Sequence, residues 1–276
     1  MLGIILVTLS SLFNEVAASI GKRKIELKQE SMYSMAFLCY FWSSVWFLGV
    51  MLFRHEFIFS MASLPTFIAR VIFEIIQTEI AIQALVRADR STFGFIRTST
   101  VVMLLLVDLA LGYSISLTQI AGMVIISLTL LIVFMNHGIS KRGLKFVVLS
   151  AIGAVITTTL YKYNISHFNS VEAEQFMINI FMIAYFFRAA MKFNSENPMK
   201  FMIKPIFFGQ SFTDGLGTVL SSFAYSLAPA SVIMAGGRST SVFFSILSGS
   251  HYFKEKNVLM KLVIFMMLAV GIFLLV

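Results

Sequence analysis

The chain of 276 residues is 58% hydrophobic and only 12% charged, with a formal net charge of +8 and a mean hydropathy of +0.89. Soluble domains typically contain roughly 25% charged residues, so this composition excludes a water-soluble globular protein and indicates a chain that uses the lipid bilayer as its solvent. The single cysteine, Cys39, excludes an intrachain disulfide and a cysteine-based zinc site.

Ten apolar segments follow one another along the chain, each close to the roughly 20 residues that a membrane-spanning helix needs. The first segment has neither the basic start nor the small-residue cleavage site of a signal peptide, so it is predicted to be a span. The links between segments are too short to hold a folded domain. The predicted spans are residues 2–20, 33–53, 64–86, 92–111, 117–135, 144–162, 172–190, 205–227, 231–250 and 257–276.

The basic residues gather in alternate links. An even number of spans places both termini on one side of the membrane, and the positive-inside rule assigns the basic links to the cytoplasm. The sequence therefore predicts a multi-pass protein of the inner (plasma) membrane with both termini outside the cytoplasm. The basic residues in or beside the links that join spans 1–2, 3–4, 5–6, 7–8 and 9–10 are Lys22, Arg23, Lys24, Lys28, Arg87, Arg90, Lys141, Arg142, Lys145, Arg188, Lys192, Lys200, Lys204, Lys254, Lys256 and Lys261.

An internal repeat is predicted from two similar segments, residues 95–101 and 236–242. Each contains an arginine, Arg97 or Arg238, followed by three small hydroxyl-bearing residues. Their offset divides the chain into residues 1–137 and 141–276, with five predicted spans in each part. Because five is odd, the two parts would insert in opposite directions, as in transporters that bind substrate near the bilayer midplane. Chance recurrence is the alternative, and the even division of the spans speaks against it.

The ends of the two parts resemble the drug/metabolite transporter superfamily, in its ten-span EamA-like form. The resemblance rests on ALVRADRS at 84–91, YSLAPASV at 225–232 and FKEK at 253–256, which are loose motifs. It implies two five-helix repeats over nearly the whole chain. The EamA-like family usually has cytoplasmic termini, whereas the charges of this chain predict the opposite orientation.

The first span is also similar to the first helix of small multidrug resistance proteins, through NEVAASIGK at 14–22. In those proteins a membrane-embedded glutamate binds either protons or substrate, and the resemblance places Glu15 in that role. The repeat offset gives Ile156 as its counterpart, so carboxylate coupling would differ between the two parts. A structural ion pair is the alternative for Glu15.

Ionisable residues within the predicted spans are the candidate site, because a charge at the bilayer centre costs roughly 2.5–3.5 kcal/mol and must face a cavity or a partner. Arg70 and Glu74 are four residues apart and are expected to pair along one helix face. Asp108 lies near the end of its span and is expected to be solvated. Helix packing by small residues is the alternative for the serines. The predicted substrate-binding or coupling residues are Glu15, Glu74, Arg97, Asp214, Arg238, Gln210 and Ser241.

These features predict a secondary active transporter, a proton-coupled exporter or exchanger of a small metabolite or drug-like compound. The alternatives are a facilitative uniporter or channel for an anionic or zwitterionic metabolite, and a non-transporting membrane scaffold. The chain lacks a GxxxxGK[ST] motif and the nucleophile or metal motifs of an intramembrane enzyme, so we expect no enzyme activity, no cofactor and no catalytic or metal site. The expected partners are the bilayer, the substrate and protons, with no nucleic acid, in a monomer or homodimer.

Overall fold

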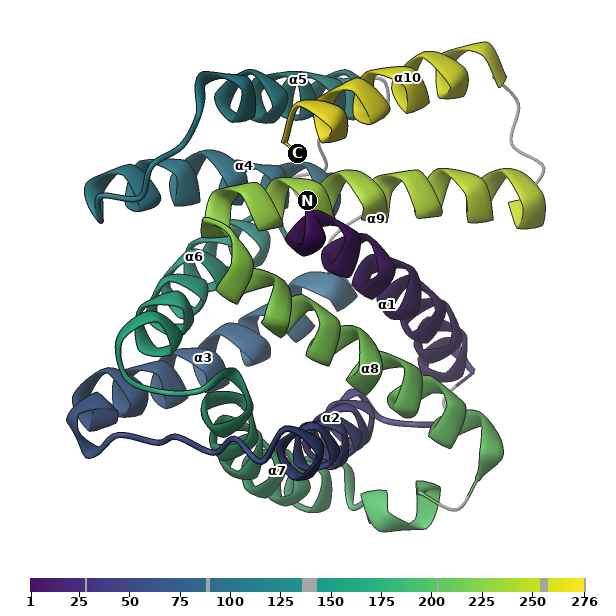
Figure 1. The fold of residues 1–276 in the computed structure, drawn as a ribbon. Helices are drawn as coiled ribbons and strands as arrows, with labels where there is room; N and C mark the ends of the chain where they lie inside the picture. Colours follow the sequence, from purple (N-terminus) through teal and green to yellow (C-terminus); the bar gives the residue numbers. More distant parts are fainter. Residues whose placement is uncertain (28, 88–89, 136–142, 203, 254–257, 276) are drawn as a thin grey trace. The chain divides into compact units, whose positions relative to one another are not determined.

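The computed structural model describes residues 1–27, 29–87, 90–135, 143–202, 204–253 and 258–275, and this part of the chain is helical, with no strand. All ten predicted segments form helices. The bounds are α1 Leu2–Glu26, α2 Met32–Arg54, α3 Leu64–Arg87, α4 Arg90–Ala110, α5 Leu117–Met135, α6 Leu144–His167, α7 Val171–Asn194, α8 Pro205–Leu227, α9 Ala230–Phe253 and α10 Val258–Leu275, with short 3-10 helices η1 Met61–Ser63 and η2 Pro198–Phe201 (Figure 1).

Four helical segments among the described residues are long and apolar enough to cross a membrane. They are Met32–Arg54, Met61–Ala81, Leu144–His167 and Val171–Asn194. Shorter apolar helices run over Leu2–Ala17, Ser99–Ala110, Leu117–Thr129 and Met266–Leu275. The prediction of a helical protein is therefore confirmed, and four of its helical segments have the length and apolar composition that crossing a membrane requires.

The helix ends follow from local capping. Ser31 and Ser170 precede α2 and α7 in extended conformation, and their hydroxyl groups accept hydrogen bonds from the backbone N–H groups of the first helical turn. At the other ends, His55 and Ser195 adopt the left-handed conformation, with φ of 54° and 51°, that stops a helix. Pro205 opens α8, where its missing N–H costs no hydrogen bond.

The chain forms two compact units, and each unit draws on both halves of the sequence. Unit 1 contains Met1–Thr8, Ile76–Leu160 and Leu227–Val276, and unit 2 contains Leu9–Ile75 and Tyr161–Ser226. The predicted halves, residues 1–137 and 141–276, were defined by sequence similarity between them. A division into compact units does not test such a similarity, so the two halves stay a prediction.

Unit 2 is built on the antiparallel pair of α2 and α7. Early residues of α2 contact late residues of α7: the rings of Tyr33 and Phe193 are 5.8 Å apart, and the side chain of Asn179 donates to Ser43 near the middle of both helices. The last turn of α2 in turn reaches the start of α7, where Arg54 contacts Glu172. This pair forms the frame on which the charged side chains of the unit are placed.

Unit 1 contains two further antiparallel pairs, α4 with α9 and α5 with α10, which lie side by side in Figure 1. In the second pair the helices approach at two glycines: a Cβ atom added to Gly122 would lie 2.8 Å from the carbonyl oxygen of Gly271. The side chain of Gln119 also donates to the carbonyl oxygen of Leu275, at 3.4 Å. In all three pairs the partners are five helices apart along the chain.

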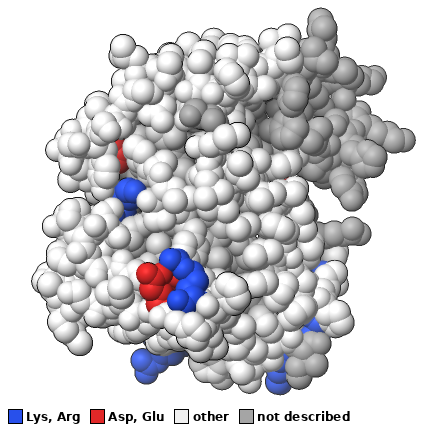
Figure 2. Space-filling view, in the orientation of Figure 1, with Lys and Arg blue, Asp and Glu red and all other residues white. Residues whose placement is uncertain are grey.

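Polar and apolar side chains are distributed in the reverse of the usual manner on α7. Glu172, Glu174 and Asn179 are buried, whereas Ile180 and Phe181 are 44% and 46% exposed. Outside its grey residues, the face seen in Figure 2 is largely uncharged; one acidic group touches a basic group near its centre, and a few further basic side chains lie along its lower edge. Large exposed apolar surfaces are rare on soluble monomers, so this arrangement suits a helix surrounded by lipid.

Candidate functional site

A buried ion pair between Arg70 of α3 and Glu174 of α7 is the centre of the polar interior of unit 2. The guanidinium Nη1 lies 2.7 Å from Glu174 Oε1, and the side chains are 4% and 0% exposed. Arg70 Nη2 also donates to Gln175 Oε1 at 2.8 Å. Two adjacent residues of α7 thus hold one arginine of α3.

Two asparagines complete the surroundings of Glu174. Asn164 donates to Oε1 at 2.9 Å and Asn169 donates to Oε2 at 2.6 Å, so both carboxylate oxygens accept hydrogen bonds. Asn169 further binds the hydroxyl of Ser63 and the backbone N–H of Ser60. The network therefore joins the carboxylate to the link between α2 and α3.

Aromatic and hydroxyl groups close the network on its other side. The ring of Tyr161 in α6 lies over the guanidinium of Arg70, 4.5 Å from its centroid, which is within the range of a cation–π contact. The hydroxyl of Tyr161 donates to the backbone carbonyl of Ser222, and Gln175 donates to the hydroxyl of the same residue. Side chains of α3, α6 and α7 and the backbone of α8 thus meet around one charge.

The expected pairing of Arg70 with Glu74 is wrong. Arg70 contacts Glu174 across the helix interface, where Asn164 and Asn169 hold the carboxylate in place by hydrogen bonds. Sequence reasoning missed Glu174, since two acidic residues in the first turn after a serine cap resemble an ordinary helix start. The sequence feature that could have identified Glu174 is its position, with Glu172, in the first turn of a long apolar segment. Gln175 joins this network by accepting a hydrogen bond from Arg70 and donating one to the hydroxyl of Ser222.

A second, more exposed ion pair lies at the same end of α2 and α7. Arg54 Nη1 is 2.7 Å from Glu172 Oε1, and its other terminal nitrogen contacts Glu56. The guanidinium of Arg54 lies 5.3 Å from the ring centroid of Phe223 in α8. This end of the unit is thus held by two arginine–glutamate pairs.

In unit 1, Asp108 sets the register of α4 against α9. It is 1% exposed, and its Oδ2 accepts a hydrogen bond of 2.7 Å from the backbone N–H of Ser231 in the first turn of α9. The expectation that Asp108 is solvated is wrong, because the free N–H groups at a helix start bind a carboxylate well.

The two arginines of the similar segments lie on this pair of helices. The hydrogen bond between Asp108 and Ser231 brings these two residues to the same level on α4 and α9. Because the helices are antiparallel, Arg238, seven residues after Ser231, then lies level with Val101, seven residues before Asp108. Val101 is four residues from Arg97. Four residues correspond to about 6 Å along a helix. Both arginines and Ser241 are half-buried. Arg97 and Arg238 therefore lie at levels about one helical turn apart on α4 and α9.

The other predicted site residues belong to unit 2. Glu15 and Glu74 are half-buried on α1 and α3. Gln210 is 2% exposed and lies against Gly21, where an added Cβ atom would be 2.6 Å from its amide nitrogen. Asp214 accepts a hydrogen bond from Cys39 on α2. The structure thus brings Gln210 and Asp214 into the interior of unit 2, and Arg97, Arg238 and Ser241 onto α4 and α9 of unit 1.

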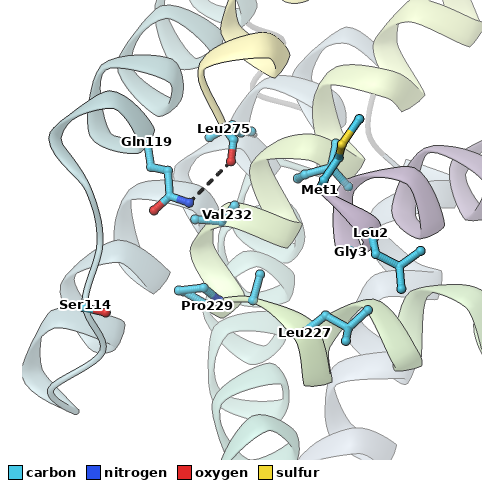
Figure 3. A pocket seen from close by; sticks show the side chains of 11 residues that line it. Met1, Leu2, Gly3, Ser114, Gln119, Leu227, Pro229, Val232 and Leu275 are labelled. Atoms are coloured by element: carbon cyan, nitrogen blue, oxygen red, sulfur yellow. Dashed lines mark hydrogen bonds between the residues drawn. The ribbon is translucent and has the colours of Figure 1, made fainter.

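A cavity of about 350 Å³ lies in unit 1 between the starts of α1, α5 and α9 and the end of α10. Figure 3 shows the hydrogen bond from Gln119 to Leu275 at its edge. The predicted site residues do not line it. The lining residues are Met1, Leu2, Gly3, Ile4, Ser114, Gln119, Leu227, Ala228, Pro229, Val232 and Leu275.

Comparisons with known proteins relate the chain to others through its fold. No family model and no curated protein matches it. Among solved structures 24 chains match. One is described only as "Crystal structure of protein"; it has a TM-score of 0.75 at 9% sequence identity, with 99% of this chain and 95% of that chain covered. At this identity the likeness shows the fold alone.

Proposed function

We propose that the chain is a secondary transporter that moves a small anionic or zwitterionic metabolite, or a drug-like compound, across the membrane. In this proposal all ten helices are spans, both termini lie outside the cytoplasm, and the chain is an EamA-like member of the drug/metabolite transporter superfamily. Residues 1–137 and 141–276 are the two halves of an inverted repeat. Arg97 and Arg238 bind the anionic group of the substrate.

One observation carries the proposal: the helix pairs α2–α7, α4–α9 and α5–α10 are antiparallel, and each joins helices five apart. This is the pairing expected when two five-helix halves of opposite orientation meet around a pseudo-twofold axis. The hydrogen bond from Ser231 to Asp108 supports a register in which the two similar arginine segments overlap along α4 and α9. A substrate between them would contact equivalent residues from both halves.

The burial of charge supports transport over a scaffold role. Arg70, Glu174 and Asp108 lie inside apolar helices at considerable cost, and intramembrane ionisable residues commonly mark substrate or ion pathways. Glu15, Glu74 and Asp214 are the carboxylates that would couple transport to protons, and the resemblance of residues 14–22 to small multidrug resistance proteins favours Glu15.

The experiment is a thermal-stability screen of purified protein with a panel of anionic, zwitterionic and cationic metabolites, followed by uptake of each stabilising compound into proteoliposomes. Ligands that bind the folded state raise the melting temperature by mass action. Hydrogen bonds to charged groups contribute about 1.5–3 kcal/mol, so Arg97→Ala and Arg238→Ala should each weaken binding by roughly 10- to 100-fold.

Arg188→Ala, at an exposed arginine of α7, is the matched control and should bind with wild-type affinity. Stabilisation by anions that both site variants retain would reject the arginine site. A panel in which compounds bind but none is taken up would argue for a non-transporting role.

A further inference from the structure

The end of unit 2 opposite its arginine–glutamate pairs contains a carboxylate that joins the start of α2 to the segment after α7. Glu196 follows α7, and its Oε2 accepts hydrogen bonds from the backbone N–H of Ser31 at 3.1 Å and from the hydroxyl of Ser34 at 2.6 Å. Ser31 is also the residue that caps α2. The contact therefore ties the start of α2 to the segment after α7.

A second carboxylate, Glu30, lies in the link between α1 and α2, directly before Ser31, whose backbone N–H binds Glu196. It is only 4% exposed, and neither of its oxygens has a hydrogen-bond partner among the described residues. An ionised carboxylate in this position would be both desolvated and unsatisfied, which costs considerable free energy. The neutral acid avoids most of this cost and can donate a hydrogen bond.

The charges around Glu30 favour its protonated form. Burial, and to a smaller extent the negative charge of Glu196, raise the pKa of Glu30 from 4.5 to about 8, while the positive charge of Lys24 opposes this rise. Lys24 is itself engaged with Gln29, whose Oε1 is 2.8 Å from its Nζ. Cys39 on α2 is a further titratable group within electrostatic range of Glu30.

We propose that Glu30 is a proton-binding site, and that the proton on its carboxyl group keeps a second negative charge away from Glu196, which ties the start of α2 to the segment after α7. A proton suits this place better than a metal ion, because Ca²⁺ and Mg²⁺ take about six or more oxygen ligands. No group of three or more histidine, cysteine, aspartate or glutamate side chains suited to a metal occurs among the described residues.

Loss of the proton leaves buried Glu30 negatively charged within electrostatic range of half-buried Glu196. Their repulsion opposes the contact between Glu196 and Ser31, so this end of the α2–α7 pair becomes easier to open as the pH rises. The opposite end is held by Arg54–Glu172 and Arg70–Glu174, whose arginines stay charged. The proton site thus makes the two ends of one helix pair respond differently to pH.

The site can be tested without a substrate, so the result is independent of the proposed transport function. Purified protein is titrated between about pH 5 and pH 10, and the infrared band of protonated carboxyl groups is recorded, a range that covers the raised pKa of Glu30. Wild type is compared with Glu30→Gln and Glu196→Gln. The control is Glu56→Gln, at a glutamate that is 44% exposed.

We expect a carboxyl band that disappears with a midpoint near pH 8 in wild type. It should be missing in Glu30→Gln, unchanged in Glu56→Gln, and shifted to a lower midpoint in Glu196→Gln. A wild-type protein with no such band, or Glu30→Gln with the same band, would overturn the proposal. If Glu30→Gln does not fold, the midpoint in Glu196→Gln decides: a lower midpoint supports the site and an unchanged one rejects it.

The dependence of stability on pH gives a second readout with a defined sign. Because the pKa of Glu30 is raised on folding, the folded state binds the proton more tightly, and its contribution to stability is complete below about pH 4.5 and lost as the pH rises to about 8. The melting temperature of wild type should fall over this range relative to that of Glu30→Gln. Parallel curves for the two proteins would count against a proton at this site.

Discussion

Arg70 shows how a charged side chain is accommodated inside an apolar helix. Its positive charge is balanced by Glu174, and the remaining oxygen of that carboxylate is bound by Asn169. The aromatic face of Tyr161 covers the guanidinium. Buried ion pairs contribute little net stability compared with apolar packing, but removal of one partner leaves an uncompensated charge.

Substitution of Glu174 is therefore expected to be strongly destabilising. Glu174→Gln keeps the shape of the side chain but leaves Arg70 without its counter-charge, which costs about 3–5 kcal/mol in comparable buried pairs. The measurement is the free energy of unfolding, or the melting temperature, of purified protein in one detergent. The control is Glu56→Gln, because Glu56 is exposed and such pairs contribute about 0–1 kcal/mol. Equal stability of both variants would mean that the ion pair contributes nothing.

Individual pairings were the part of the site that sequence could not predict. The spacing of Arg70 and Glu74 allowed an ion pair along one helix, but the actual partner lies 104 residues away in sequence. Asp108 was expected to face solvent because of its place near a helix end, whereas it binds the start of another helix. In both cases the tertiary neighbour, which has no local signal, determines the role of the side chain.

The helices themselves could be predicted closely, because their determinants are local. The lengths of the apolar segments, the serines before α2 and α7 and the proline at the start of α8 are visible in the sequence. The largest differences are at α1 and α6, which extend beyond the predicted spans to Glu26 and His167. These extensions are amphipathic or polar, so an apolar-segment criterion ends too early there.

The close approach of α5 and α10 depends on the absence of side chains at two glycines. Gly271→Leu should force the helices apart, since even a Cβ atom there would lie 2.5 Å from Ile126 Cγ1. Overpacking of this kind costs about 1–3 kcal/mol. The melting temperature of the variant should fall, whereas Gly49→Leu, at a helical glycine with open space around it, should change it little. A fall of the same size in both variants would show that helix propensity, rather than packing, is responsible.

At the scale of the whole molecule, the prediction that can be examined most directly is the membrane topology. Single cysteines introduced into a Cys39→Ser background at exposed positions of the links, Leu27→Cys and Phe57→Cys, flank α2 at its two ends. If α2 spans the membrane, an impermeant thiol reagent added to intact cells should label position 57 but not position 27, since the basic link is expected in the cytoplasm. Permeabilised cells, in which both positions should react, are the control. The opposite pattern would reverse the proposed orientation, and equal labelling in intact cells would argue against a span.

The composition of the two units has a consequence for the order in which the protein assembles during synthesis. α4 and α5 are made early, but their partners α9 and α10 are the last helices of the chain, so unit 1 cannot complete its packing until nearly all residues have been added. The hydrogen bond to Asp108 can form only after Ser231, more than 120 residues further along the chain, has been synthesised. Such long-range contacts slow folding, so α4 and α5, which contact each other, cannot complete their packing until α9 and α10 have been made.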